Sequence, residues 1–405
     1  MKYFEPIITH FTDNDLYTFT CMYYIIQTYP RAEVEYTFFD RNNTVYPDGF
    51  ADMLKEQMEY MKNVVITEDE IKYMLDRCYY LPKWFIDVFL RGFRFNPKEL
   101  DISQDSEGHL HISVKGKWYS TIIWEMPILS CVSELMHRLN GDIEKYDVEL
   151  ETARTKAKAK KMFDNGLVVG DMGTRRRMSF EHHYNTLKTI KEVWDSEVLW
   201  ESGAKWTGTS NVWFAKELGM NCLGTMSHQI ISFEENVSGV FEANHNVMQK
   251  WSRCYFADLG LYLYDTFGDN VFFSNFSKDM AMLYSGLRVD SGIEEEQIDK
   301  IASKYKELGI DPMSKQVIFS NGLNVDRAIE IANYAKFKVI PSFGIGTYIT
   351  CDVTDVKPMN IVVKLTKMRI TENREWHDCV KLSCDKGKTL GNKDKCNYLL
   401  SVINN

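Results

Sequence analysis

The chain has 405 residues, of which 44% are hydrophobic and 26% are charged, so it is long enough for two domains or for one barrel with an accessory layer. A net charge of −9 argues against nucleic acid as the main partner, and no apolar run approaches the roughly 18–20 residues that span a bilayer. Nine cysteines without a C-x-x-C pair, and a start without the apolar core of a secretion signal, indicate a cytoplasmic protein with reduced thiols.

The first 120 residues predict a mixed α+β domain. A helical apolar pattern follows Asp15 and stops at Pro30. Residues 32–41 then alternate between polar and apolar side chains like a strand. Residues 109–127 predict two strands joined by a turn at Lys115-Gly116.

From about residue 120 onward, short apolar runs that end in small or polar residues alternate with helical patterns. Ser210 and Asn324 suit helix N-caps, and Gly219 and Gly309 suit helix ends. Strand, polar loop and helix in this repeated order are typical of parallel βα units. Six such strand ends favour an irregular, TIM-like parallel α/β barrel.

These patterns divide the chain into two domains. We assign the barrel to residues 121–354. The α+β domain is assigned to residues 1–120 and is completed by residues 355–405, because residues 360–368 predict one more strand. The polar tail from residue 371 is expected to pack back on this first domain.

In a barrel of this kind the chemistry lies at the carboxyl ends of the strands. The residues at these ends include anion donors, carboxylates and one imidazole. They are Asp171, Arg175, Thr225, His228, Asp265, Arg288, Asp290, Asn321 with Gly322, and Thr347.

Three short motifs could bind anions or metals, and each also has a plainer interpretation. The backbone N–H groups near Gly344 and Gly346 could hold a phosphate, although a Gly-x-Gly run also forms simple turns. In the run of arginines 175–177, one or two could reach an anion, or all could form a basic surface cluster. Arg288 and Asp290 share one face of a strand, where they could bind ligands or form a structural ion pair.

Several common motifs are absent from the sequence. There is no P-loop and no H-E-x-x-H motif. His182 and His183 are neighbours, and on a helix their side chains diverge by about 100°, so they do not suit one metal ion. His228 taken alone suits a packed, hydrogen-bonded histidine. Its position at a strand end beside Thr225 favours a reactive role instead.

Taken in order along nearly the whole chain, the motifs resemble the nicotinate phosphoribosyltransferase family, one of the type II phosphoribosyltransferases. The segments that carry the resemblance are "TDNDLYTFTC", "WEMPIL", "GDMGTRRRMSFEHH", "GTSNVWFAKELGMNCLGTMSHQ", "YDTFGDNVF", "LRVDSG", "IFSNGLN", "FGIGT" and "NIVVKL". The resemblance implies an irregular α/β barrel beside an α/β sandwich domain. It also implies the transfer of phosphoribose from phosphoribosyl pyrophosphate to nicotinate, an early step toward NAD, which needs Mg²⁺ and is coupled to ATP hydrolysis.

The resemblance also implies roles for individual residues. His228, in Gly-Thr-Met-x-His, would be phosphorylated transiently by ATP. Thr225 and Tyr17 would line the nicotinate pocket, and Arg288 would meet the nicotinate carboxylate. Arg175 would lie near substrate or pyrophosphate.

Further roles follow for the phosphate and metal sites. Gly344, Gly346 and Thr347 would hold the 5-phosphate, and Asp290 is the candidate Mg²⁺ ligand. In the family Tyr17 reaches the site of a neighbouring subunit, so a homodimer is implied.

The chain departs from the family pattern at three positions. Ile293 and Asn321 stand where the family usually has aspartate, and Gln229 stands where it often has glutamate after the histidine. Fewer carboxylates could weaken Mg²⁺ binding or move its site. Two alternatives therefore remain: a related transferase that uses nicotinamide or quinolinate, and a silent sensor of phosphoribosyl compounds.

Overall fold

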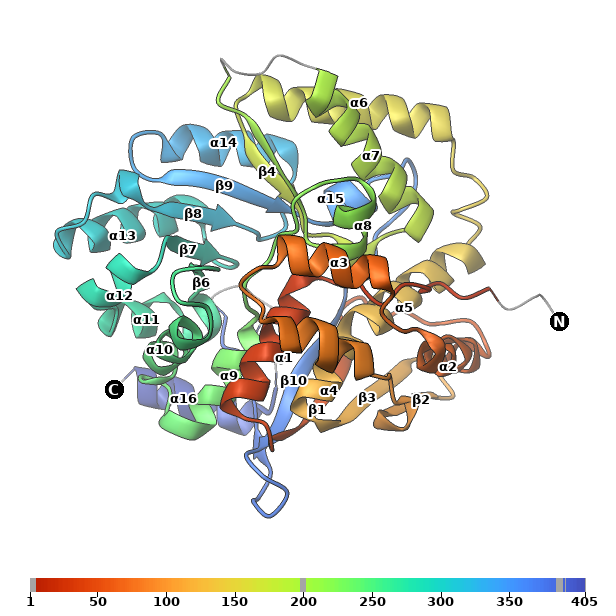
Figure 1. The fold of residues 1–405 in the computed structure, drawn as a ribbon, viewed down its shortest axis with the longest axis horizontal. Coiled ribbons are helices and arrows are strands. Elements are labelled where there is room, and N and C mark those ends of the chain that lie inside the picture. The colour runs from red at the N-terminus through yellow and green to blue at the C-terminus, as the bar shows by residue number, and fades with distance from the viewer. Residues whose placement is uncertain (1–4, 197–201, 384–388, 390, 405) are drawn as a thin grey trace.

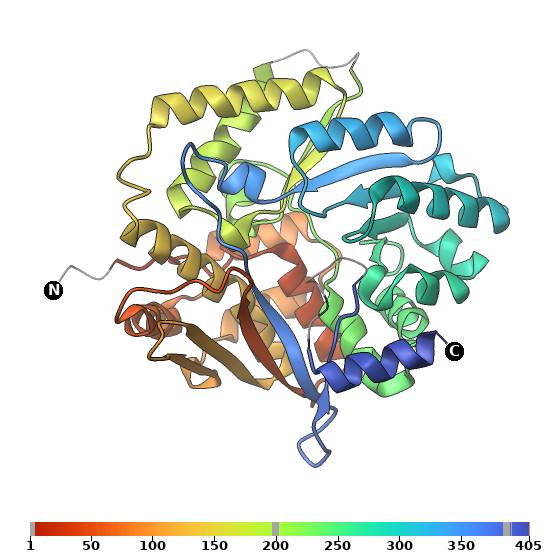
Figure 2. The same cartoon turned by 180° about the vertical axis from the view of Figure 1, so that it is seen from behind.

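A computed structural model describes residues 5–196, 202–383, 389 and 391–404 (Figures 1 and 2). One of its two sheets is antiparallel, in the order β11-β10-β1-β3-β2. Its strands are β1 Glu33–Asp40, β2 Leu100–Gln104, β3 Leu110–Lys117, β10 Ile361–Arg369 and β11 His377–Asp378. The long strand β10 pairs with β1, so the C-terminal segment completes a sheet that the N-terminal segment begins.

The prediction of two strands and a turn over residues 109–127 is wrong. Strand β3 continues through Gly116, which pairs with Val34 of β1, and helix α4 (Trp118–Thr121) follows directly. A Cβ at Gly116 would lie 3.1 Å from Thr121 Cγ2, so this glycine allows close packing of α4 on the sheet. The large apolar side chains after it are buried on helical turns, which a solvent-facing strand could not achieve.

The second sheet has six parallel strands in the order β5-β4-β9-β8-β7-β6. The strands are β4 Val168–Asp171, β5 Lys205–Thr209, β6 Leu261–Leu263, β7 Gly286–Val289, β8 Gln316–Phe319 and β9 Ile340–Ile345. Helices cover its outside, as Figures 1 and 2 show for α6 (Val148–Asp164), α7 (Phe180–Ser196), α13 (Glu294–Glu307) and α14 (Val325–Ala335). This arrangement confirms the predicted α/β fold.

The strand expected before "GTMSHQ" is not a regular strand, and this explains why the barrel is irregular. Cys222 forms an isolated parallel bridge to Thr209 of β5. Three residues later in the same segment, Thr225 Oγ1 donates a hydrogen bond to the carbonyl oxygen of Leu261 in β6, at 3.0 Å. An extended segment of a few residues therefore connects β5 to β6 across the gap in the sheet.

The expected helix ends are confirmed, with one exception. Helix α8 (Val212–Glu217) is capped by Asn211, whose side chain accepts a hydrogen bond from Phe214 N, rather than by Ser210. Helix α14 is capped by Asn324 as predicted. Gly219 and Gly309 follow helices with φ of 62° and 71°, in the left-handed region that glycine adopts most easily.

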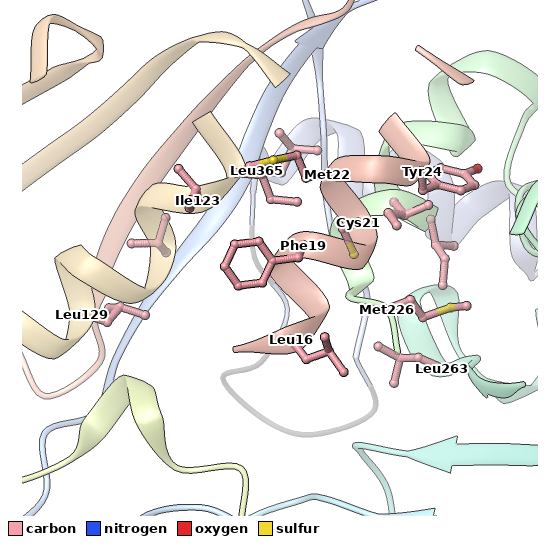
Figure 3. Close-up of a cluster of buried hydrophobic side chains, with 14 of the residues drawn as sticks. Leu16, Phe19, Cys21, Met22, Tyr24, Ile123, Leu129, Met226, Leu263 and Leu365 are labelled. Atoms are coloured by element: carbon pink, nitrogen blue, oxygen red, sulfur yellow. The ribbon is translucent and has the colours of Figure 1, made fainter. Parts of the chain in front are cut away.

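Helix α1 (Leu16–Thr28) joins the two sheets into one hydrophobic core. Figure 3 shows it between Ile123, Leu129 and Leu365 on one side and Met226 and Leu263 on the other. The remaining helices on the antiparallel side are α2 (Phe50–Tyr60), α3 (Glu68–Arg77) and α5 (Glu125–Leu139). Because one helix packs on both sheets, residues at its start lie at the carboxyl ends of the barrel strands.

The tail packs on the first domain only in part. Helix α16 (Lys393–Ile403) lies against α9 (His228–Ser238), where Lys395 Nζ is 2.6 Å from Glu235 Oε2. None of the helices in the described part of the chain combines the length and apolar character that crossing a membrane requires. The cysteines within the described ranges are free thiols.

Candidate active site

Two cavities of about 100 Å³ each lie at the carboxyl ends of the parallel strands. We call the first the histidine cavity; its lining includes Tyr17, Glu125, His228, Asp290, Lys364 and Lys381. We call the second the glycine cavity; its lining includes Arg176, Ser320, Gly322, Gly344, Gly346 and Thr347. Met172, Arg175 and Arg288 line both, so the two cavities are adjacent parts of one site.

His228 is the first residue of α9, directly after the barrel segment that joins β5 to β6. Its Nδ1 lies 3.1 Å from Thr266 Oγ1, and its Nε2 lies 3.0 Å from Asp290 Oδ2 and 2.9 Å from Lys381 Nζ. Burial, followed by the charge of Lys381, lowers the pKa of His228 to about 4. The imidazole is therefore neutral near pH 7 and has the electron pair that a nucleophile needs.

Two carboxylates flank this imidazole. One ligand atom each from His228, Asp265 and Asp290 lie within 4.8 Å of one another. Asp265 Oδ1 is buried, 3.8 Å from His228 Nδ1, and accepts no hydrogen bond from the described residues. Burial by itself would raise the pKa of Asp290. The hydrogen bond from His228 and the charges of Lys381 and Arg288 outweigh burial and hold this pKa well below its usual range.

Two lysines enter the histidine cavity from the C-terminal segment. Lys364 lies on β10, and burial lowers its pKa to about 8, although the nearby Glu125 opposes this shift. Lys381 is held in place because the next residue, Leu382, donates its N–H to the Thr266 carbonyl oxygen at 3.0 Å. The sequence patterns predicted neither residue. A single lysine in an otherwise apolar strand is a weak signal, and Lys381 belongs to no recognisable motif.

Tyr17 lines the histidine cavity of its own chain. Its hydroxyl donates a 2.7 Å hydrogen bond to Glu125 Oε2, and Glu125 Oε1 lies 3.7 Å from Arg175 Nη1. Burial, and then the charge of Glu125, raise the pKa of Tyr17 well above its usual value. The expectation that Tyr17 also reaches a neighbouring subunit stays a prediction.

Thr225 does not share this cavity with Tyr17. It lines an adjoining cavity inside the barrel, together with Arg288 and Met172. The two cavities share Met172, Gly224 and Arg288, so the expectation that Thr225 and Tyr17 both line the nicotinate pocket stays a prediction. Gly224, with φ of 144°, lines both cavities.

The glycine cavity is suited to an anion. Three arginines line it, and no carboxylate does among the described residues. A Cβ at Gly344 would lie 2.4 Å from Met172 Sδ, so a larger residue would push Met172 into the cavity. Thr347 begins the short helix α15 (Thr347–Thr350) at the edge of this cavity. Gly322 lines it as well, whereas Asn321 is not part of the lining of either cavity.

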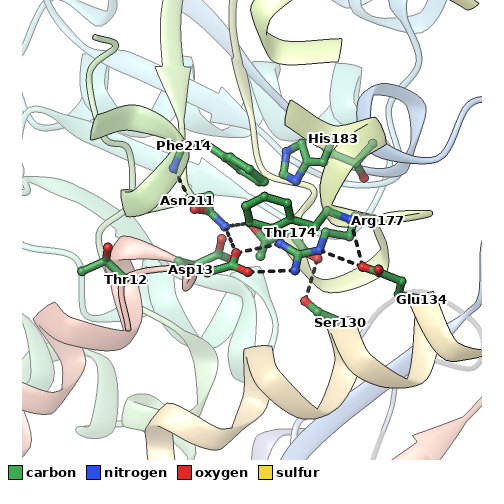
Figure 4. A network of polar contacts seen from close by, with 12 residues as sticks. Thr12, Asp13, Ser130, Glu134, Thr174, Arg177, His183, Asn211 and Phe214 are labelled. Atoms are coloured by element: carbon green, nitrogen blue, oxygen red, sulfur yellow. Dashed lines mark hydrogen bonds and ion pairs between the residues drawn. The ribbon is translucent and has the colours of Figure 1, made fainter. Parts of the chain in front are cut away.

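The three consecutive arginines have different roles. Arg175 lines both cavities, and Arg176 lines the glycine cavity. Arg177 is fully buried and makes a two-pronged pair with Asp13, at 2.6 and 2.8 Å (Figure 4). Asn211 Nδ2 donates a further 2.7 Å hydrogen bond to Asp13 Oδ1. This buried pair holds the arginine loop against α1 and α8.

Asp171 is structural and lines neither cavity. Its Oδ2 accepts a 2.6 Å hydrogen bond from Thr209 Oγ1 and lies 2.8 Å from His183 Nε2. Its Oδ1 accepts the N–H of Gly173 at 2.9 Å. Asp171 therefore orients the loop that carries Arg175. His182 packs edge-on against Tyr146, so the two adjacent histidines point to different partners.

Comparison with known proteins decides the family. A model described as the nicotinate phosphoribosyltransferase (NAPRTase) family matches residues 167–401, and a model of its N-terminal domain matches residues 12–133. The chain belongs to the nicotinate phosphoribosyltransferase family. A nicotinate phosphoribosyltransferase of Desulforapulum autotrophicum is 36% identical over 98% of this chain and 99% of its own length. One of Chromohalobacter salexigens is 34% identical over 96% and 97%.

Solved structures of the nicotinate phosphoribosyltransferase family have the same fold. The crystal structure of nicotinate phosphoribosyltransferase from Porphyromonas gingivalis has a TM-score of 0.92 and 37% identity, and the match covers 98% of this chain and 100% of that one. The structure from Vibrio cholerae has a TM-score of 0.87 and 26% identity over 98% and 94%.

The departures from the usual family motifs lie outside the imidazole's contacts. Gln229 Oε1 accepts the Tyr36 hydroxyl hydrogen bond, and Trp118 Nε1 lies 3.4 Å away, so Gln229 anchors α9 to β1 and does not orient His228. Ile293 is the exposed N-cap residue of α13. The two nearby carboxylates, Asp265 and Asp290, remain beside His228.

Proposed function

We propose that this enzyme of NAD biosynthesis joins nicotinate to phosphoribosyl pyrophosphate, giving nicotinate mononucleotide and pyrophosphate, and that it couples this transfer to ATP hydrolysis through His228. The observation that carries the proposal is the adjacency of two cavities. The glycine cavity is lined by arginines and, among the described residues, by no carboxylate. It shares Arg175 and Arg288 with the histidine cavity, which holds a neutral imidazole and two lysines.

The glycine cavity suits the 5-phosphate of the ribose. Backbone N–H groups near Gly344 and Gly346, with the Thr347 hydroxyl, can donate to phosphate oxygens at close range. Arg176 adds a positive charge on the same side. The ribose would then extend past Arg175 toward the histidine cavity, where Lys364 and Lys381 can offset the charge of pyrophosphate.

Nicotinate binding follows from the groups that the cavities share. Arg288 can pair with the carboxylate through its guanidinium, and Tyr17 offers an aromatic face to the flat ring. The ring nitrogen attacks C1 of the ribose while the bond from C1 to the pyrophosphate oxygen breaks. No proton has to be removed from nicotinate, so the residues mainly position the reactants and stabilise the departing charge.

Mg²⁺ fits the carboxylate pair beside His228. Asp265 Oδ1 is buried and accepts no hydrogen bond from the described residues, and the pKa of Asp290 stays low, so both can present charged oxygens of the kind Mg²⁺ prefers. When bound, the ion would neutralise phosphate or pyrophosphate oxygens. Asp290 also contacts Arg288 loosely, at 3.9 Å, so the pair can separate when ligands enter.

For ATP coupling, the neutral imidazole of His228 would attack the γ-phosphorus, forming an N–P bond as the bond to ADP breaks. Water would later cleave this bond and release phosphate. A phosphorylated His228 adds about two negative charges near Asp290, which Lys381 and Arg288 must offset. We further propose a homodimer; with Tyr17 within its own chain's site, this rests on the family resemblance alone.

The test is a product assay with nicotinate, phosphoribosyl pyrophosphate and Mg²⁺, with and without ATP. We expect nicotinate mononucleotide and pyrophosphate, with a higher rate when ATP is present. Nicotinamide and quinolinate are assayed in parallel and should react poorly, because Arg288 and Tyr17 select a flat ring with one carboxylate. Tight substrate binding without product would instead identify a sensor and contradict the proposal.

A further inference from the structure

A third cavity, of about 180 Å³, lies inside the barrel. We call it the barrel-core cavity. It extends from Arg288 and Met172 at the carboxyl ends of the strands to Val168 and Gln316 at their amino ends. Barrel interiors of this class are usually filled by layers of side chains. An open space along the strands is therefore a feature that needs an explanation.

The exposure pattern of β8 supports this space independently. Val317 and Phe319, which face the outer helices, are 0% exposed. Gln316 and Ile318, which alternate with them and face the barrel interior, keep partial exposure. Ile318 pairs with Ser342 of β9, and both line the cavity at the same level. The short serine side chain leaves room where a larger residue would close the barrel.

The lining defines the chemistry of the occupant. Most of it is apolar, and among the described residues Arg288 is its only charged side chain. A charged group deep in this space would lack a partner, so the occupant must be neutral. Apolar cavities of about 150 Å³ bind benzene, so a group of up to about six heavy atoms fits.

This space is continuous with the site described above. Met172 and Arg288 line all three cavities, and Gly224 lines both the histidine cavity and the barrel-core cavity. A Cβ at Gly224 would lie 3.0 Å from Tyr17 N, so only glycine keeps the backbone this close to α1 without narrowing the passage. A ring whose carboxylate meets Arg288 therefore has open space behind it.

We propose that the barrel-core cavity accepts an uncharged apolar substituent on the pyridine ring of the substrate. This rests on the proposed function, because it uses Arg288 as the carboxylate anchor. Substituents at carbons 4 and 5 can point away from the reacting nitrogen and into the barrel. Substituents at carbons 2 and 6 would crowd the ribose next to that nitrogen.

The test compares nicotinate with its 4-methyl, 5-methyl and 5-chloro derivatives, and with 2-methyl and 6-methyl derivatives as controls. We expect at least one 4- or 5-substituted acid to react within about tenfold of the kcat/KM of nicotinate. Ser342→Leu fills the cavity and should lower kcat/KM for that acid by at least about tenfold, with nicotinate nearly unchanged. Ile318→Phe is a second filling variant, and Ser342→Ala is the matched control that keeps the space open.

Each outcome separates the two proposals. Failure of wild type to use nicotinate would overturn the proposed function itself. Normal use of nicotinate, with rejection of every 4- and 5-substituted acid, would overturn the substituent pocket alone. Equal losses for nicotinate and the substituted acid in both filling variants would also overturn it, because a pocket for the substituent must act only on the substrate that carries one.

Discussion

Lys381 Nζ lies 2.9 Å from His228 Nε2, although 153 positions separate the two residues in the sequence. His228 Nε2 also lies 3.0 Å from Asp290 Oδ2. A neutral imidazole nitrogen either donates or accepts, so it can hydrogen-bond to only one of these groups at a time. The position of its proton is therefore set by the balance between an ammonium and a carboxylate, and it changes when a ligand binds either one.

Removing the charge of Lys381 should change the pH dependence of the reaction. The Lys381 ammonium is the second-largest cause, after burial, of the low pKa of His228, which is about 4. In Lys381→Met this pKa rises, so the acid limb of the kcat/KM profile should move to higher pH. NMR titration of the His228 ring checks the same shift directly. Lys393→Met, an exposed lysine in the same tail, is the control and should leave the profile in place. An unmoved acid limb in Lys381→Met would contradict this role.

His228→Ala should abolish ATP hydrolysis but leave slow transfer that does not depend on ATP. The reason is that the imidazole is the proposed phosphoryl acceptor, whereas the groups that position nicotinate remain. The measurement is ADP release and nicotinate mononucleotide formation in the same reaction. Full ATPase activity in this variant would remove His228 from the mechanism.

Asp13→Asn should destabilise the whole protein. It leaves the fully buried Arg177 guanidinium without its two-pronged partner, and breaking a buried pair costs about 3–5 kcal/mol. Urea unfolding measures the change. Asp52→Asn is the comparison, because Asp52 pairs with Lys55 while 79% and 50% of the two side chains are exposed, so it should cost less than about 1 kcal/mol. Similar costs for both variants would refute the argument.

Cys351→Ala should weaken binding of phosphoribosyl pyrophosphate. Asp142 Oδ2 accepts a 2.7 Å hydrogen bond from His137 Nδ1. His137 Nε2 can therefore accept a hydrogen bond from the Cys351 thiol, at 3.6 Å. This contact ties the end of α15, beside Thr347, to α5. We expect KM for phosphoribosyl pyrophosphate to rise several-fold with little change in kcat. Cys351→Ser keeps a donor and should restore KM; if serine and alanine behave alike, the contact does not position the loop.

His182 should make the fold sensitive to acid. Neither of its buried ring nitrogens has a hydrogen-bond partner among the described residues, and burial lowers its pKa to about 3. The unfolded chain binds the proton below about pH 6.5 and the folded chain only below about pH 3, so stability falls as pH drops through this window. His182→Phe should reduce this loss by on the order of a few kcal/mol, as measured by urea unfolding at pH 7 and pH 4.5. An unchanged difference between the two pH values would show that folding does not lower the pKa of His182 and would contradict this prediction.

Residues at strand ends were the most predictable part of the site. Arg288, His228 and the Gly344–Thr347 segment follow short apolar runs, and parallel strands must bring their carboxyl ends to one edge of the sheet. Asp171 has the same sequence signature, but it is buried against Thr209 and His183. A strand-end position thus makes a residue a candidate for the site, and the direction of the side chain is decided by its neighbours.

The amino-acid sequence alone determined the alternation of strands and helices, the family and the order of the anion-binding motifs, because these depend on local patterns along the chain. Tertiary structure alone decided that Lys364, Lys381 and Tyr17 line the histidine cavity, and that Thr225 lines the barrel-core cavity. These outcomes depend on how distant segments pack against each other. No pattern within one segment encodes which remote backbone will lie beside it.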